Sequence, residues 1–533
     1  SWQGRLCMNI WVVSREYAGI AEAGGVKNVA CSLSESLAKA GHSVTLFIPL
    51  YGCTDLSSVS DFTCFFHRPV TITICGKEMT VSFSAGKMNG VNIVFIGNRA
   101  FSEKKAVYTY TREEEAVNPC HCHGEGHEDA MFLNTLFQKT VAYYGTTCSK
   151  EEIPDIIHCQ DAPAALVPVF VDYLKRTDKA MKSFYRNTKC LVTIHNAGPG
   201  YHHEFCSLQD AVDITSIPVS YFEKAMNGSC CEPFLAAAAC GASITTVSPE
   251  YALEILEGKT ETAGLTEGFL RLKTGITGIT NGIDTDRYDP CDTSKSLLPY
   301  PFSPEHMELE GKKKCLDYLL SHYASLASSK KQAVQGIEQY GYIKRKKNEE
   351  PVYIAFHGRI VSQKGISVLA KAADMLLQQK LPVKFVFIGQ GQPDLERELL
   401  QVALKYEGDC VFFRGYDRAL SRLCVAACNF AVFPSFFEPC GLEDFIAQVY
   451  GTLPVAHATG GLCKIISEET GFLYGDNTPE ELSGMLYSLI KIMDRAGKNI
   501  FNGMVCYAAS YVRENYSWQK VAQKYTELYE SLK

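Results

Sequence analysis

The residues best suited to chemistry follow two apolar runs late in the chain. The run 431–433 ends in a loop that carries one carboxylate, Glu438, just before a Pro-Cys-Gly turn. The run 453–456 ends in a loop that closes on Gly460 and Gly461. Short apolar runs are typical of buried strands, and open α/β sheets bind ligands beyond the carboxyl ends of their strands. We therefore predict a ligand site at these two loops.

A glycine-rich loop near the start of the chain also follows an apolar run that is typical of a strand. The apolar run 8–13 is followed by Gly19, Gly24 and Gly25, then by an amphipathic helical stretch and a second apolar run at 43–48. This order is typical of a βαβ unit in a parallel sheet. The bare N–H groups at a helix amino end favour phosphate, but the loop is neither a dinucleotide fingerprint nor a P-loop. It indicates either a phosphate contact or simply a tight turn.

Polar residues also end three further apolar runs in the first half of the chain. Asp161, the pair His195-Asn196, and Ser248 each follow such a run. A single histidine at a strand end is more often structural. Three polar strand ends in one parallel sheet favour a polar cleft along its edge.

The elements that must position these residues form two α/β patterns. From residue 352 apolar runs and helical stretches alternate again, and the runs end at Gly358-Arg359, at a Gly-Gln-Gly loop and at Tyr416. Such alternation predicts a doubly wound sheet. A turn-rich stretch at 275–290 suits a chain that leaves the first domain.

A chain of 533 residues is too long for one hydrophobic core. We expect a first Rossmann-like domain over 1–290, a mostly helical interdomain segment with solvated lysines over 291–350, and a second Rossmann-like domain over 351–510. The fold class is α/β.

Composition excludes several functions. The net charge of -7 argues against a broad nucleic-acid surface, and no apolar run reaches the roughly 20 residues of a membrane span. The start of the chain lacks the pattern of a signal peptide. The 22 cysteines are scattered through core-like positions such as Cys31, Cys190 and Cys428, which indicates free thiols and a reducing cytoplasm. The run 120–123 alternates Cys and His, but its spacing favours a polar loop over a zinc site.

Taken together, these loops resemble the family of bacterial glycogen synthases and plant starch synthases, from about Met8 to the end of the chain. The most specific segments are 356–365, 434–442, 450–455 and 458–462, with support from 193–196, 246–249 and 281–284. The resemblance implies two Rossmann-like domains that face each other across a cleft (the GT-B type), with a C-terminal helix over 511–533 that crosses back to the first domain. It implies transfer of glucose from ADP-glucose or UDP-glucose to the non-reducing end of an α-1,4-glucan, with retention of configuration and with no metal or other cofactor.

The resemblance also implies roles for the residues named above. Arg359 and Lys364 would stabilise the charge that develops on the leaving nucleoside diphosphate, and Glu438 would contact hydroxyls of the donor sugar or ribose. Asp161, His195 and Asn196 would line the acceptor or sugar pocket. The other residues expected to bind the donor are Gly24, Gly25, Gly358, Tyr416, Cys440, Gly441, Leu442, Thr459, Gly460 and Gly461.

The sequence departs from the family pattern mainly in its first half. Glu22 stands where the family has a lysine, and Pro163 where it has a histidine. A carboxylate 4 Å from a diphosphate is repelled by about 1 kcal/mol even in water, so Glu22 must point away or be paired; Lys27 or Arg15 could supply the missing charge. In the second half, Phe436 replaces an arginine, and a Glu-Asp pair at 443–444 replaces Thr-Gln.

Three functions remain open on the sequence alone. The first is an active α-glucan synthase. The second is a glycosyltransferase of the same fold with another donor or acceptor, and the third is a catalytically weak protein that binds glucan or nucleotide.

Overall fold

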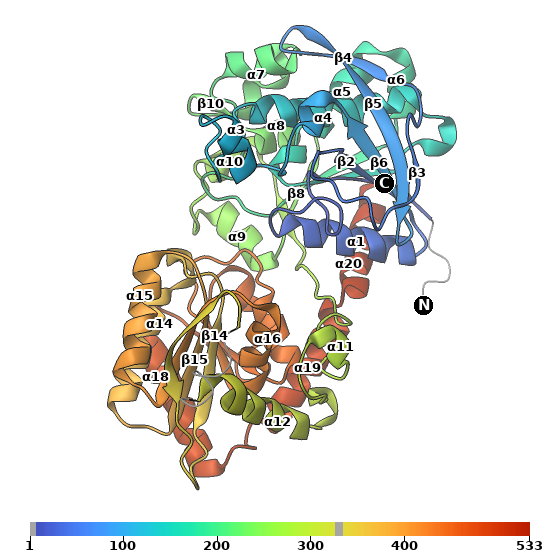
Figure 1. Ribbon diagram of the computed structural model, residues 1–533. Helices are drawn as coiled ribbons and strands as arrows, with labels where there is room; N and C mark the ends of the chain where they lie inside the picture. Colours follow the sequence, from blue (N-terminus) through green and yellow to red (C-terminus); the bar gives the residue numbers. More distant parts are fainter. Residues whose placement is uncertain (1–6, 326–333) are drawn as a thin grey trace. The chain divides into compact units, whose positions relative to one another are not determined.

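The computed structural model describes residues 7–325 and 334–533, and the chain divides into two compact units. The first unit contains the described residues up to Gly282 together with Trp518–Lys533, and the second contains Ile283–Ser517. Each unit is an α/β sheet covered by helices (Figure 1). None of the helices in the described part of the chain is long and apolar enough to cross a membrane.

The first unit is built on a large, mostly parallel sheet with the order β12-β11-β8-β7-β1-β2-β6-β5-β3, and β4 pairs with β5. Its strands are β1 (Asn9–Val13), β2 (Ser43–Pro49), β3 (Ser60–Thr63), β4 (Val70–Ile74), β5 (Lys77–Met88), β6 (Val91–Gly97), β7 (Ile156–Gln160), β8 (Lys189–Ile194), β11 (Ser243–Thr246) and β12 (Ile276–Gly278), with a separate hairpin of β9 (Met226–Asn227) and β10 (Cys230–Cys231). Its helices are α1 (Val26–Lys39), α2 (Arg99–Ser102), α3 (Arg112–Val117), α4 (Ala130–Tyr144), α5 (Val167–Thr177), α6 (Lys179–Phe184), α7 (Leu208–Thr215), α8 (Pro233–Ala239), α9 (Pro249–Glu257), α10 (Leu265–Leu272) and α20 (Trp518–Leu532).

The direction of the chain reverses beside β1. From β1 the chain passes through α1 to β2 on one side, whereas β7 and β8 lie on the other side of β1. Right-handed crossovers that run in opposite directions place their helices on opposite faces of a sheet. Accordingly, α1 and α20 pack together, and α4, α5 and α8 are grouped on the other face (Figure 1). The switch point of this sheet therefore lies between β1 and β7, next to the glycine loop and Asp161.

The second unit has the strand order β13-β16-β15-β14-β17-β18-β19, all parallel except β13. Its strands are β13 (Ile337–Ile343), β14 (Val352–His357), β15 (Val383–Gly389), β16 (Asp409–Gly415), β17 (Phe430–Phe433), β18 (Leu453–His457) and β19 (Phe472–Tyr474). Its helices are α11 (Thr293–Ser296), α12 (Glu310–Leu319), α14 (Ile366–Gln378), α15 (Pro393–Lys405), α16 (Arg418–Ala427), α17 (Glu443–Val449), α18 (Pro479–Ala496) and α19 (Asn502–Tyr516).

Strand alternation divides the interior of the second unit into two cores. On β14, Val352, Ile354 and Phe356 belong to the core that contains α14 and α18, whereas Tyr353 and Ala355 belong to the core that contains α12 and α16. Both faces are buried because successive side chains of a strand point to opposite sides. Here the order reverses between β14 and β17, which defines the second switch point.

The predicted interdomain segment, residues 291–350, is part of the second unit instead. Its strand β13 pairs antiparallel with β16, and α12 packs on α16. Lys312, expected to be solvated, donates from its Nζ to Ala426 O at 2.5 Å and to Thr452 Oγ1 at 2.8 Å. Burial lowers the pKa of Lys312 to about 7. The charge pattern was misleading because a lysine stem can bury against apolar surface while its amine satisfies carbonyl groups. Part of the segment, 326–333, lies outside the described residues.

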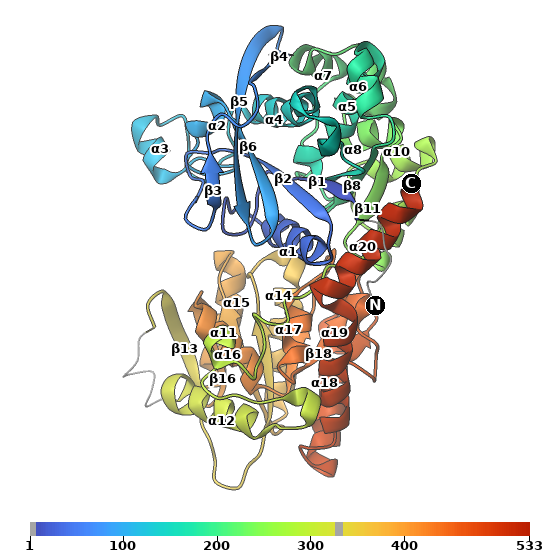
Figure 2. The same cartoon turned by 90° about the vertical axis from the view of Figure 1, so that its right-hand side faces the viewer.

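The C-terminal stretch predicted as one helix over 511–533 consists of two helices that break at Ser517. Only α20 packs in the first unit, where it lies beside α1 (Figure 2). Its Tyr529 hydroxyl pairs with His158 Nδ1 at 2.7 Å, and burial lowers the pKa of His158 to about 3. His158 is therefore a neutral structural histidine that holds α20. All 22 cysteines are free thiols, as predicted, although Cys31 and Cys190 are only partly buried.

Candidate active site

The second switch point brings a lysine and a carboxylate together. Lys364 ends the short helical turn Ser362–Lys364 after β14, and Glu438 lies in the loop after β17. Lys364 Nζ donates to Glu438 Oε2 at 2.5 Å, and the two side chains are 21% and 14% exposed. The two residues are 74 positions apart in sequence, so this pair depends on the parallel pairing of β14 with β17.

The loop that carries Glu438 is held by its own backbone. Gly461 N–H donates to Glu438 O at 2.8 Å, and His457 Nδ1 lies 2.6 Å from Ser435 O. Asn477 Nδ2 donates to Pro434 O at 2.7 Å. These contacts join the loops after β17, β18 and β19, and they fix the position of the carboxylate. The amide of Gly461, predicted as a donor to phosphate, already has a partner in this arrangement.

Two glycines allow these loops to approach closely. Gly365 has φ +71°, and a Cβ there would lie 1.7 Å from Pro434 O. A Cβ on Gly461 would lie 2.1 Å from Cys440 O. No side chain fits at such distances, so both positions require glycine. Without Gly365 the lysine turn could not lie against the end of β17.

The two replaced residues at the start of α17 form ion pairs. Glu443 Oε2 lies 3.0 Å from His357 Nδ1, and Asp444 Oδ1 lies 3.1 Å from Lys464 Nζ. Burial disfavours the charged forms of His357 and Lys464. Their carboxylate partners outweigh this effect, so that Glu443 raises the pKa of His357 and Asp444 raises the pKa of Lys464. The partners Lys464 and His357 were not predicted from the sequence. The replacement of Thr-Gln by Glu443 and Asp444 could have indicated them, because a buried carboxylate needs a cation.

Arg359 and Tyr416 are exposed at the same edge. Tyr416 is 58% exposed and follows β16, while Arg359 follows β14. A cavity of about 80 Å³ lies beside Tyr416. It is lined by Arg287, Tyr288, His357, Tyr416, Arg418, Ser421, Arg422, Val425, Glu443 and Ile446. The edge thus offers an aromatic face, guanidinium groups and the Lys364–Glu438 pair within one unit.

The other predicted donor residues lie around the Glu438 loop. Thr459 Oγ1 donates weakly to Phe436 O at 3.5 Å, Cys440 is buried, and Gly358 N–H donates to Ile388 O. Phe436, which replaces an arginine, is 55% exposed. The predicted residues also include Gly441, Leu442 and Gly460, which belong to the same loops.

In the first unit, a buried carboxylate occupies the glycine loop. Glu16 Oε1 accepts hydrogen bonds from the N–H groups of Gly24 at 3.2 Å and of Lys27 at 2.8 Å. The amide of Gly24 therefore already has an anionic partner, while Gly25 has open space around it. Glu22 points to Gly19, whose N–H donates to Glu22 Oε1 at 3.1 Å. Glu16 was not predicted from the sequence, because no neighbouring residue marks it as the partner of a loop eight residues later.

Arg15 does not supply the charge missing at Glu22. Its side chain is buried and donates to Tyr51 OH at 3.0 Å, Asn134 Oδ1 at 2.6 Å and Val107 O at 2.8 Å. Of the two candidates, Lys27 is the one that is partly exposed.

Asp161, His195 and Asn196 come together at the ends of β7 and β8. His195 N–H donates to Asp161 Oδ1 at 3.1 Å, and His195 Nε2 lies 2.8 Å from Gln160 Oε1. Burial raises the pKa of Asp161 to about 7 and lowers the pKa of His195 to about 4. Asp161 has φ +66°, a strained conformation of the kind that clusters at functional sites. Pro163 is buried in the turn after it.

Metal-compatible clusters among the described residues lie elsewhere. They are His67–Cys148–Glu152 and His202–Glu204–Glu232, and neither includes the Cys-His run at 120–123. In the second cluster both ring nitrogens of His202 have protein partners, Glu232 Oε1 and Ala197 O. In the 120–123 run, His121 stacks on Tyr110 and contacts Glu128.

Two doubly wound sheets in one chain, each with polar groups at its switch point, are the architecture of the GT-B fold, and comparison with solved structures confirms this fold. The catalytic domain of starch synthase IV from Arabidopsis thaliana, solved with ADP and acarbose bound, matches with a TM-score of 0.76 over 99% of both chains at 23% identity. Sucrose-phosphate synthase from Thermosynechococcus elongatus matches with a TM-score of 0.51, covering 98% of both chains at 16% identity.

Sequence comparison gives the family. Residues 9–271 match the model of the starch synthase catalytic domain, and residues 343–499 match that of group 1 glycosyl transferases. The glycogen synthase of Thermodesulfovibrio yellowstonii is 28% identical over 541 residues, covering 98% of each chain. That of Moorella thermoacetica is 28% identical over 539 residues, covering 98% of this chain and 96% of the relative. The chain belongs to the glycogen synthase and starch synthase family of glycosyltransferases.

Proposed function

We propose that this protein transfers glucose from ADP-glucose or UDP-glucose to the non-reducing end of an α-1,4-glucan, with retention of configuration. The observation that carries the proposal is the Lys364–Glu438 pair at the switch point of the second unit. A nucleotide sugar needs both a cation for its diphosphate and an acceptor for its hydroxyl groups. This pair supplies one of each, at the sheet edge where α/β folds bind ligands.

In this proposal the second unit binds the donor. Lys364 moves from Glu438 to the diphosphate, and Arg359 adds a second cation as negative charge develops on the leaving group. Glu438, freed from the lysine, accepts hydrogen bonds from sugar or ribose hydroxyls. Tyr416 offers an exposed ring on which the base stacks. The remaining loop residues position these groups through the backbone contacts described above.

The first unit supplies the sugar and acceptor contacts. Asp161 and His195 are held against each other, and burial favours the neutral form of His195. A neutral imidazole and the Asn196 amide suit uncharged sugar hydroxyls. The leaving phosphate takes the proton of the acceptor hydroxyl on the face from which it departs, which gives retention without a protein nucleophile. The reaction needs no metal, and the free thiols suit a protein that works in the cytoplasm.

A specific observation favours a second candidate, a catalytically weak protein that binds glucan or nucleotide. At the proposed donor edge, Lys364, His357 and Lys464 each pair with a carboxylate of the protein itself. A diphosphate must compete with these internal anions. If it cannot, glucan binding persists without transfer.

Glucose incorporation into glycogen, measured side by side with ADP-glucose and UDP-glucose, separates the candidates. The synthase proposal predicts transfer from at least one donor, and the faster donor identifies the base. Glycogen binding without transfer from either donor would instead support the second candidate. Transfer to another acceptor class would indicate a different glycosyltransferase of the same fold.

A further inference from the structure

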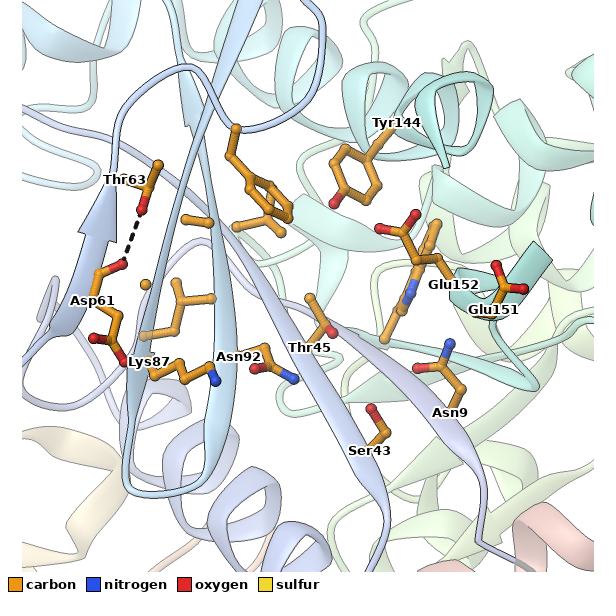
Figure 3. A pocket seen from close by; sticks show the side chains of 16 residues that line it. Asn9, Ser43, Thr45, Asp61, Thr63, Lys87, Asn92, Tyr144, Glu151 and Glu152 are labelled. Atoms are coloured by element: carbon orange, nitrogen blue, oxygen red, sulfur yellow. Dashed lines mark hydrogen bonds between the residues drawn. The ribbon is translucent and has the colours of Figure 1, made fainter. Parts of the chain in front are cut away.

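A pocket in the first unit lies away from the residues discussed above. Its volume is about 320 Å³, within the range of small-molecule sites (Figure 3). Asn9, Ser43 and Asn92, which line it, belong to the starts of β1, β2 and β6. Asp161 and His195 follow the opposite, carboxyl ends of strands in the same sheet. Strands of five to seven residues separate the two edges by about 15–25 Å.

The pocket has a floor and two fixed walls. Strands β1, β2 and β6 form the floor, and the segment 61–67 and the turn Lys150–Glu152 form the walls. His67 Nε2 lies 2.7 Å from Glu152 Oε1, so a direct contact joins one wall to the other. Glu152 is itself fixed by the N–H of Ser149 at 2.7 Å.

The wall at 61–67 is strained. Asp61, Phe65 and His67 have φ values of +53°, +56° and +61°, although none is glycine. Left-handed backbone is costly for bulky residues, and it persists where surrounding structure enforces it. Three such residues within seven hold Asp61, Thr63 and Phe66 along the pocket. At Asp61 the strain coincides with an irregular register between β3 and β5, whereas Phe65 and His67 lie between the strands β3 and β4.

Several polar side chains that line the pocket make no hydrogen bond within the part of the chain that the structure describes. Among the described residues, the side chains of Thr45, Lys87 and Asn92 and the hydroxyl of Tyr144 have no hydrogen-bond partner. Figure 3 shows Thr45, Lys87 and Asn92 along the floor, with Asp61 at one side and Glu151 and Glu152 at the other. Trp11 and Tyr144 are buried beneath an exposed rim that includes Asp61, Lys87 and Glu151.

This composition selects the class of ligand. Three carboxylates against one lysine repel phosphates and nucleotides. Amide, hydroxyl and carboxylate groups can pair with sugar hydroxyls, and the partly exposed ring of Phe66 can contact the apolar face of a sugar, whereas the rings of Trp11 and Tyr144 are buried. We infer that the pocket is a second carbohydrate site, which holds a short stretch of α-1,4-glucan away from the polar strand ends. The identity of the sugar rests on the proposed function.

The test measures retardation of the full chain in native gels that contain amylopectin. Thr45→Ala and Asn92→Ala should each weaken binding about tenfold, as expected for loss of a sugar hydrogen bond. Thr71→Ala is the matched control, because Thr71 is an exposed threonine of β4 outside the pocket. Thermal unfolding of all three variants should match that of the original chain. Transfer to maltotriose, which is too short to need a second site, should keep its turnover.

Each outcome separates this inference from the proposed function. Unchanged retardation of both folded pocket variants would overturn the carbohydrate site, whether or not the enzyme transfers glucose. Lost retardation in both variants, with Thr71→Ala unaffected, would support the site even if no glucose transfer were detected. Equal losses in all three variants would point to a general effect on the sheet and would also overturn the site.

Discussion

Glu443 is a carboxylate at the proposed donor site, where it would oppose the binding of a diphosphate. It pairs with His357, and Lys364 and Arg422 also help to lower its pKa despite its burial. A carboxylate among the cations proposed to hold a diphosphate competes with that diphosphate. Sequence comparison with the family pattern located the replacement, but the pairing with His357 required the three-dimensional positions of β14 and α17.

We therefore predict that Glu443→Gln binds ADP about fivefold more tightly than the original chain, because about 1 kcal/mol of repulsion is removed. Isothermal titration calorimetry at constant ionic strength measures this. Glu469→Gln, an exposed residue of the same unit, is the control and should leave the affinity unchanged. Weaker ADP binding by Glu443→Gln would mean that Glu443 organises the site rather than competing with the ligand.

The raised pKa of Asp161 predicts that the stability of the protein depends on pH. Its pKa is about 7 in the folded protein and about 3.9 in an unfolded chain, so between these values only the folded state holds the proton. The resulting stabilisation is complete below about pH 4 and is lost as the pH rises to 7, with a slope of at most about 1.4 kcal/mol per pH unit. Asp161→Asn removes this effect.

Thermal unfolding of the original chain and of Asp161→Asn between pH 4.5 and pH 7 measures this pH-dependent stabilisation. The original chain should lose stability relative to Asp161→Asn across this range. Parallel stability curves would show that burial does not raise the pKa of Asp161 and would contradict this prediction.

At the scale of elements, the approach of the lysine turn to β17 depends on one glycine. Gly365→Ala would place a methyl group 1.7 Å from Pro434 O in a left-handed conformation. We predict a loss of several kcal/mol in unfolding free energy, since the backbone must move. Gly484→Ala, in the interior of α18 with nothing within 4 Å, should instead stabilise by about 0.5–1 kcal/mol.

Urea unfolding compares the two variants with the original chain. Equal effects of the two substitutions would show that the loops after β14 and β17 do not need the close approach. A destabilised Gly365→Ala variant should also lose nucleotide binding, because its lysine turn moves away from Glu438.

The elements were largely predictable and their partners were not. Apolar runs located β1, β14 and β17 because buried strands need such runs. The role of Lys312 was missed because a lysine run reads as solvent-facing, whereas this amine satisfies Ala426 O and Thr452 Oγ1. Sequence periodicity reports which face of an element is apolar, and it does not report which carbonyls lie beyond that face.

At the scale of the molecule, both units place their unusual residues at a switch point. The strand order reverses beside β1 in the first unit and beside β14 in the second. That regularity made Glu438 and Asp161 predictable as strand-end residues, because α/β sheets bind ligands at this edge, whereas Lys364 was identified through the family resemblance. It could not reveal Glu16, whose carboxylate fills the glycine loop, or the pocket at the opposite edge of the first sheet.

In the proposed reaction Lys364 stabilises the leaving nucleoside diphosphate. The most direct measurement is the initial rate of glucose transfer to maltoheptaose by Lys364→Ala, with Lys346→Ala as the control for an exposed lysine of the same unit. We expect Lys364→Ala to lose about 100- to 1,000-fold in turnover while it remains folded, and we expect the control to be unaffected. A near-normal rate in a folded Lys364→Ala variant would show that Lys364 does not stabilise the leaving group.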